Sequence, residues 1–312
     1  MSTPLRLGTR RSALASTQAG LVAAALTQRT GHPVELVPVT TLGDTSRAAL
    51  TQLGGTGVFV GALREALVAG QIDAAVHSLK DLPTAGPDDI RLAAVPPRED
   101  PRDVLVARDG LTLGELPAGS RVGTGSPRRA AQLRALGLGL EVVGVRGNVD
   151  TRLRLVVDGQ VDAVVLARAG LARLGRLDAV TEVIDPLQML PAPGQGALAV
   201  ECRDSDTTTA ELLDTLDDAV TRLVVEAERT LLAVLEAGCS APVGALAEAA
   251  EPEPSEHVQE LYLRAVVCAI DGSASVRLSA TGPLDEAARI GRDLAADLLA
   301  EGAADLMWER VR

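Results

Sequence analysis

Arginines gather at three places where a strand-like run passes through a glycine-containing turn into a helical pattern. The turns are Leu7–Ser12, Val122–Arg129 and Val145–Arg152. Ser126 and Asn148 are the expected N-caps of the second and third helices. A helix N-terminus already carries partial positive charge and free N–H groups, so arginines there are unfavourable unless an anion lies close by. The turns therefore predict binding sites for carboxylate or phosphate groups, all on one side of an inferred sheet.

The segment Val76–Pro83, with the sequence VHSLKDLP, follows another strand-like run, and open α/β sheets place their sites at that end of a strand. Lys80 is the one lysine among thirty basic residues, which indicates a need for an ammonium group there. Asp81 has two interpretations, either a carboxylate for proton transfer and cation stabilisation or a turn residue before Leu-Pro. We interpret His77 as a hydrogen-bonded structural residue.

The chain has three cysteines, and Cys239 alone lies in a loop of small residues. Cys202 and Cys268 lie in apolar strand-like runs and are predicted to be buried. No basic residue adjoins Cys239 in sequence, so both a reactive and an inert thiol remain open. The spacing fits neither a disulfide framework nor a zinc site, and a reducing cytoplasm suits it. The glycine-rich run Gly54–Gly57 before Phe59 is either a lid or simply a loop into a helix.

The charge distribution sets one segment apart. The 312 residues carry a net charge of −12, yet residues 121–176 hold ten arginines and four acids, whereas residues 201–312 hold nine arginines and twenty-three acids. The overall acidity argues against a general polyanion binder, and three aromatic residues nearly exclude base-stacking platforms. The basic segment is either a solvated helical face or a pocket for a small anion.

Apolar runs alternate with helical patterns through the first two hundred residues, which predicts α/β units around mostly parallel sheets. Gly70–Val76 echoes Gly159–Val165, and Leu7–Arg10 echoes Val122–Gly125. These echoes predict two related lobes with a ligand in the cleft between them. From about Asp218 onward, a long helix, two strands and a final helix predict a smaller α+β domain.

Some classes of protein fit the sequence poorly. The turns match neither the P-loop nor the full dinucleotide fingerprint, which excludes kinases and dehydrogenases. The N-terminus has no apolar signal-peptide region, and the uncharged stretch Ser12–Gln28 is typical of an amphipathic helix in a cytoplasmic protein. The alternative to an enzyme is a two-lobed small-carboxylate binding or sensor protein without catalysis, which would have no use for Cys239.

Seven motifs together resemble the hydroxymethylbilane synthase, or porphobilinogen deaminase, family. In chain order they are LGTRRSALASTQA, GGTGVF, VHSLKDLP, GTGSPRR, RGNVDTR, LPAPGQGALAVECR and EAGCSAPVG. The resemblance covers nearly the whole chain and implies an α/β fold: two lobes like those of type II periplasmic binding proteins, a central cleft and a smaller C-terminal α+β domain. The implied domains are residues 1–96 with 197–216, residues 102–190, and residues 219–312.

The resemblance implies a transferase of tetrapyrrole biosynthesis that joins four porphobilinogen molecules head to tail, loses four ammonia molecules and releases hydroxymethylbilane. It implies a dipyrromethane primer, made from substrate and linked by a thioether to Cys239, and no metal. Asp81 would be the catalytic residue, facing the pyrrole nitrogens. We expect a cytoplasmic monomer that binds neither nucleic acid nor membrane and whose product passes to a downstream cyclising synthase.

The motifs also imply which side chains bind acidic groups. Those expected to hold the cofactor, besides Cys239, are Lys80, Ser126, Arg128, Arg129 and Arg146. Those expected to hold substrate are Arg10, Ser12, Arg152, Arg173 and Phe59. Many relatives have a lysine at the position of Thr56 and often an arginine at that of Leu42, so direct ligand contacts from this loop are in doubt, and Phe59 is left as its cover over the pyrroles.

Overall fold

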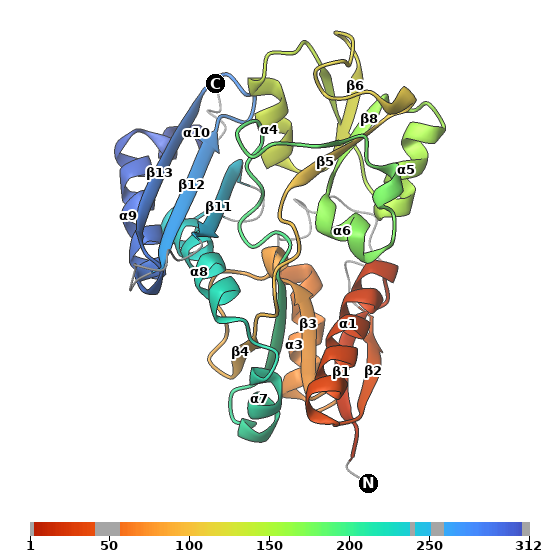
Figure 1. The fold of residues 1–312 in the computed structure, drawn as a ribbon, viewed down its shortest axis with the longest axis vertical. Coiled ribbons are helices and arrows are strands. Elements are labelled where there is room, and N and C mark those ends of the chain that lie inside the picture. The colour runs from red at the N-terminus through yellow and green to blue at the C-terminus, as the bar shows by residue number, and fades with distance from the viewer. Residues whose placement is uncertain (1–2, 41–56, 238–240, 251–258, 308–312) are drawn as a thin grey trace. The chain divides into compact units, whose positions relative to one another are not determined.

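The computed structural model describes residues 3–40, 57–237, 241–250 and 259–307 (Figure 1). Leu42, Thr56 and Cys239 lie outside these ranges; Phe59 lies in a helix, but its side chain is outside the described part. The chain forms two units, Met1–Glu99 with Ala197–Arg222, and Asp100–Gly196 with Leu223–Arg312. Each unit is described by itself.

The first unit contains a five-stranded sheet in the order β2-β1-β3-β10-β4. Its strands are β1 (Leu5–Arg10), β2 (Val34–Val39), β3 (Ala74–Ser78), β4 (Ile90–Ala94) and β10 (Leu198–Arg203). Its helices are α1 (Ala13–Thr30), α3 (Gly57–Val68), the 3-10 turn η2 (Leu79–Asp81) and α7 (Thr207–Asp214). Strands β1, β2 and β3 are parallel, and β10 is antiparallel to both β3 and β4.

The central strands β3 and β10 of this sheet are buried on both faces, whereas the edge strand β2 is mostly exposed. Leu7 of β1 belongs to the core cluster that contains Leu26 of α1. On the other face, Gly8 leaves room for Ile72, because a Cβ at Gly8 would lie 2.3 Å from Ile72 Cδ1. Leu63 of α3 packs in that second cluster with Ile72. The two helices therefore hold the strand ends of β1 and β3 rigidly.

The second unit contains a sheet of the same design, in the order β7-β6-β8-β5-β9. Its strands are β5 (Asp103–Ala107), β6 (Arg121–Thr124), β7 (Glu141–Gly144), β8 (Ala163–Ala167) and β9 (Glu182–Val183). Its helical segments are η3 (Arg108–Gly110), α4 (Pro127–Ala135), α5 (Val149–Val157), α6 (Arg168–Arg173) and η4 (Leu177–Ala179). Strands β6, β7 and β8 are parallel, whereas β5 is antiparallel to β8 and β9.

The two sheets confirm the predicted α/β duplication and its mostly parallel strands. In each sheet four strands run in one direction and a single strand, β10 in the first sheet and β5 in the second, runs antiparallel to both of its neighbours. Strands β5 and β10 enter their sheets from long connections rather than from a crossover helix, and only a crossover imposes a parallel direction. Gly123 in the second sheet corresponds to Gly8 in the first, and neither position has room for a side chain. A Cβ at Gly123 would lie 2.8 Å from Val145 Cγ1.

The C-terminal part of the second unit is an antiparallel sheet in the order β11-β12-β13 with helices packed on it (Figure 1). Its elements are α8 (Ala219–Val234), β11 (Val243–Ala249), β12 (Glu260–Cys268), β13 (Ser275–Pro283), η5 (Leu284–Glu286), α9 (Ala287–Ala300) and α10 (Ala303–Met307). Helix α9 crosses α8 closely, because a Cβ at Gly291 would lie 2.4 Å from the carbonyl oxygen of Ala227. Leu190, Leu246 and Cys268 share one core cluster with Ala131 of α4.

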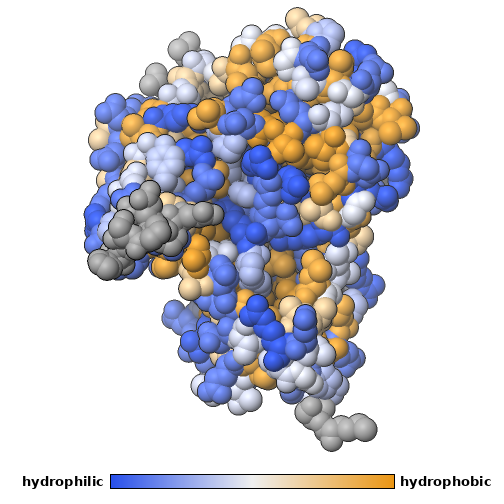
Figure 2. Space-filling model, in the orientation of Figure 1, coloured by the Kyte–Doolittle hydropathy of each residue, from blue (hydrophilic) through white to orange (hydrophobic). Residues whose placement is uncertain are grey.

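The visible surface mixes residue types. Figure 2 shows hydrophilic and hydrophobic residues interspersed on the face that it presents. Among the helices that the structure describes, none combines the length and the apolar character needed to cross a membrane.

Candidate functional site

Four predicted site residues lie at the carboxyl edge of the first sheet. Arg10 ends β1, and Ser12 is the N-cap of α1. Lys80 and Asp81 lie in η2, directly after β3. Since β1 and β3 are neighbouring parallel strands, the two turns open at the same edge. The structure therefore brings together the first arginine turn and the VHSLKDLP segment, as open α/β sheets do with their sites.

Hydrogen bonds and packing keep these turns in place. The Ala15 N–H donates to Ser12 Oγ over 3.3 Å, which caps α1. Gln18 of α1 donates from Nε2 to Ser78 Oγ over 3.1 Å, which ties that helix to the end of β3. Leu79 is fully buried beside half-buried Lys80 and Asp81. Lys80 and Asp81 are thus carried by a fixed turn.

His77 has a structural partner, as we interpreted, although the contact does not have the geometry of a hydrogen bond. Its Nε2 lies 3.3 Å from a carboxylate oxygen of Glu201 on β10, and both side chains are buried. Arg64 of α3 donates to the same carboxylate over 2.6 and 3.0 Å. Burial opposes ionisation of Glu201, but its contacts with His77 and Arg64 outweigh burial and lower its pKa to about 2. These contacts fasten α3 and β3 to β10.

Six other predicted site residues lie at the carboxyl edge of the second sheet. Ser126, Arg128 and Arg129 follow β6, Arg146 and Arg152 follow β7, and Arg173 ends the helix after β8. The expectation that all three arginine turns share one sheet was wrong. The first turn belongs to the first sheet and the other two to the second, because the duplicated lobes each build a separate sheet.

The second and third turns adjoin each other, and their predicted caps are confirmed. The Arg129 N–H donates to Ser126 Oγ over 3.4 Å, and the Thr151 N–H donates to Asn148 Oδ1 over 2.9 Å. Gly125 lets the two turns approach, since a Cβ there would lie 2.7 Å from the carbonyl oxygen of Val145. The helix N-termini of α4 and α5 therefore open side by side.

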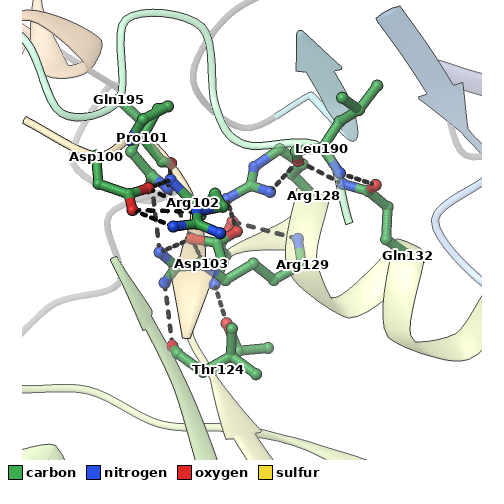
Figure 3. A network of polar contacts seen from close by, with 12 residues as sticks. Asp100, Pro101, Arg102, Asp103, Thr124, Arg128, Arg129, Gln132, Leu190 and Gln195 are labelled. Carbon is green, nitrogen blue, oxygen red and sulfur yellow. Dashed lines mark hydrogen bonds and ion pairs between the residues drawn. The ribbon is translucent and has the colours of Figure 1, made fainter. Parts of the chain in front are cut away.

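Arg128 and Arg129 point inward to a shared acid, Asp103 of β5 (Figure 3). Arg128 Nη2 and Arg129 Nη2 each lie 2.8 Å from a carboxylate oxygen of Asp103. Arg128 Nη1 also donates to the carbonyl oxygen of Leu190. Burial would raise the pKa of Asp103, but the two guanidinium charges outweigh it and hold that pKa far below its usual range. Two cations thus share one buried anion.

Sequence reasoning missed Asp103 and Gln195. Gln195 Nε2 donates to Asp103 Oδ1 over 2.7 Å, so both belong to the arginine cluster. One signal was available, because Asp103 is the lone charged residue at the start of the apolar run DVLVA, and a carboxylate in a buried strand requires a cationic partner. The partner's identity depends on tertiary contacts.

Arg152 adds a third positive charge to this edge. Its Nε is buried without a hydrogen-bond partner among the residues that the structure describes. Burial and then the charge of Arg129 lower the pKa of Arg152. Arg152 thus brings a positive charge close to that of Arg129, and an anionic ligand would balance these charges.

The remaining predicted residues of this edge differ in exposure. Arg146 is exposed, and Arg173 donates from Nη2 to the carbonyl oxygen of Gly196 over 2.6 Å. Arg173 thus contacts the segment that carries Gln195. At this edge Arg128 and Arg129 are buried and held by hydrogen bonds, whereas Arg146 is exposed to solvent.

The two described cysteines have no accessible thiol. Cys202 and Cys268 are buried, as predicted, and burial raises the pKa of each thiol to about 11. Neither supplies a thiolate near neutral pH. Covalent chemistry at sulfur would therefore fall to Cys239, which lies outside the described residues.

Two of the solved structures that match this chain at low identity are a VFT2 domain and a methionine binding protein. The BvgS VFT2 domain of Bordetella pertussis is 18% identical, with a TM-score of 0.43, over 68% of this chain and 85% of that one. The methionine binding protein MetQ is 14% identical, with a TM-score of 0.41, over 68% of this chain and 89% of that one.

Family models and curated relatives match much more of the sequence. The model of the dipyrromethane cofactor binding domain of porphobilinogen deaminase matches residues 5–211, and that of its C-terminal domain matches residues 222–300. Porphobilinogen deaminase 1 of Streptomyces avermitilis is 60% identical over 98% of both chains. Porphobilinogen deaminase of Mycobacterium tuberculosis strain H37Rv is 60% identical over 97% of this chain and 98% of the relative. The chain belongs to the porphobilinogen deaminase family.

Proposed function

We propose that this chain joins four porphobilinogen molecules head to tail, releasing four ammonia molecules and the linear tetrapyrrole hydroxymethylbilane. The observation that carries the proposal, beside the family, is the surplus of guanidinium charge at the second sheet edge, with Arg152 Nε buried and unpartnered among the described residues. Porphobilinogen bears acetate and propionate groups, so each addition brings two more carboxylates that such an edge can bind.

The residues of this edge fit a dipyrromethane cofactor that carries the same acidic groups. Arg128 has a buried Nε without a partner among the described residues, which a ligand carboxylate would satisfy. In our proposal the cofactor is linked to Cys239 and held by Lys80, Ser126, Arg128, Arg129 and Arg146. When bound, it supplies a covalent anchor and the first nucleophilic pyrrole carbon.

Asp81 is the proposed catalytic residue. When the C–N bond of the protonated aminomethyl group of porphobilinogen breaks, ammonia leaves with the bonding electron pair, and the ring nitrogen shares the positive charge that remains. A carboxylate beside that nitrogen stabilises the cation, and a fixed turn such as η2 keeps it in place without reorganisation. Asp81 would then accept the proton that is lost when the new bond restores aromaticity.

Other side chains would bind the acidic arms of substrate and growing chain. The proposed set is Arg10, Ser12, Phe59, Arg152 and Arg173. We further propose three domains, residues 1–96 with 197–216, residues 102–190 and residues 219–312. In this proposal the enzyme is a cytoplasmic monomer whose product passes to a cyclising synthase.

Replacing Asp81 tests the proposal. Asp81→Asn keeps the shape of the side chain and removes its charge, so we expect ammonia release from porphobilinogen to fall by at least a hundredfold, on the scale of about 3 kcal/mol for one electrostatic stabiliser. Asp88→Asn, at an exposed position shortly after the same turn, is the control and should match the wild type. Near-normal ammonia release by Asp81→Asn, with an unchanged circular dichroism spectrum, would reject the catalytic role. Binding of porphobilinogen by the wild type without consumption would favour a carboxylate-binding protein instead.

A further inference from the structure

Asp103 lies where three segments of the second unit meet. It is fully buried, and its two oxygens accept four hydrogen bonds, one from Arg128, two from Arg129 and one from Gln195 (Figure 3). Three of these bonds end on Oδ1 and one on Oδ2, so both carboxylate oxygens are engaged. The position of Asp103 therefore fixes both guanidinium planes and one amide.

The segment that carries Gln195 is itself tied down. Gln195 Nε2 also donates to the carbonyl oxygen of Pro101 over 2.7 Å, and the adjacent Gly194 N–H donates to Glu228 over 2.6 Å. Asp103 consequently receives its donors from two anchored elements, α4 and the segment before β10. Its contacts are held in one geometry.

Arg128 and Arg129 differ in what they have left to offer. Arg129 uses Nε and Nη2 on Asp103 and donates from Nη1 to the carbonyl oxygen of Val165 over 3.1 Å. Arg129 therefore contributes its positive charge to the site, and this charge helps to lower the pKa of Arg152. Arg128 keeps a buried Nε that lacks a partner among the described residues.

We propose that Asp103 is a positioning residue for the reaction, holding Arg128 and Arg129 so that their surplus positive charge stays at the edge where the acidic arms bind. This inference rests on the proposed function. Asp103 touches neither substrate nor cofactor and acts through the two arginines. An asparagine in its place would lose the anion and set amide N–H groups against guanidinium donors, so the two arginines would repel each other and move.

Asp103→Asn is compared with Asp73→Asn, which removes another carboxylate bound by two arginines. Asp73 pairs with Arg6 and Arg203 in the first unit, away from the predicted site residues. Purified full-length proteins are measured for the fraction that carries a two-pyrrole mass adduct, for KM and kcat with porphobilinogen, and for Tm. We expect Asp103→Asn to lower the adduct fraction at least fivefold and to raise KM about tenfold, the effect of one charged hydrogen bond. Asp73→Asn should lower Tm alone.

A full adduct and a wild-type KM in Asp103→Asn, whatever its Tm, would overturn the positioning role. If Asp103→Asn does not fold, Gln195→Met decides, because it removes one donor to Asp103 and alters no charge. It should raise KM about two- to fivefold, less than Asp103→Asn because both arginines keep their shared anion, and an unchanged KM counts against the inference. A wild type without adduct or turnover would overturn the proposed function instead, so the two failures are distinguishable.

Discussion

The carboxylate of Glu228 accepts a hydrogen bond from the backbone N–H of Gly194 at 2.6 Å. Its other oxygen accepts one from the N–H of Ala247 at 2.8 Å. Glu228 is fully buried on α8. The Glu228 side chain thus joins helix α8 to strand β11 and to the segment that carries Gln195.

Glu228→Gln should destabilise the protein. An amide can accept only one of the two backbone bonds and places its NH₂ group against the other N–H, which costs about 1–3 kcal/mol. Thermal unfolding followed by calorimetry should show a lower Tm, and limited proteolysis should cleave near residues 191–196 faster. Glu226→Gln, at an exposed position on the same helix, is the matched control. Equal Tm values for the two variants would contradict this role of Glu228.

Arg152→Gln should weaken substrate binding. The variant removes a partly buried guanidinium whose Nε has no hydrogen-bond partner among the described residues. Because a hydrogen bond from such a charged group to a substrate carboxylate contributes about 1.5–3 kcal/mol, KM should rise about 10- to 150-fold. Steady-state kinetics with porphobilinogen measure the change. Arg154→Gln, on the exposed side of the same helix, should leave KM within twofold. A similar rise in both variants would indicate a general loss of helix charge.

Glu201 should make the first unit sensitive to acid. The contacts of its carboxylate with His77 and Arg64 outweigh burial and lower its folded pKa to about 2, below the ordinary value of 4.5. A lowered pKa stabilises the fold above the unfolded value, so this contribution, about 3 kcal/mol, is lost as pH falls from about 4.5 toward 2. Glu201→Gln should be less stable at pH 7 and show a flatter decline of Tm between pH 5 and 3.

The exposed Glu211→Gln serves as the control for this pH profile. Its Tm at pH 7 and its decline in acid should follow the wild type. If Glu201→Gln keeps the wild-type slope, the ion pair with Arg64 does not account for acid sensitivity.

Cys239→Ser should remove the covalent cofactor. Intact-mass measurement of the wild type should show an adduct of two pyrrole units, and the serine variant should show the unmodified mass and no turnover. Cys268→Ser is the control, because that thiol is buried with its pKa raised to about 11 and should not be modified. Turnover by a wild type that has the unmodified mass would contradict the covalent assignment.

The sequence by itself determined the local features of the site. Ser126 and Asn148 are helix caps because a hydroxyl or amide followed by a helical pattern satisfies free N–H groups within a few residues. The echo of Gly8 in Gly123 indicated two similar lobes, since both positions demand close backbone packing. The family itself was readable because its motifs are short and contiguous.

Only the tertiary structure decided how charges are paired. Strand β5 was not predicted because Asp103 and four apolar residues after a proline-rich joint are ambiguous without their sheet partners. Asp103 of this strand was missed for the same reason. Its carboxylate accepts hydrogen bonds from Arg128, Arg129 and Gln195, which lie 25, 26 and 92 residues away in sequence. Helix caps follow from neighbours along the chain, but the sharing of one buried carboxylate depends on distances in space, which spacing in sequence does not encode.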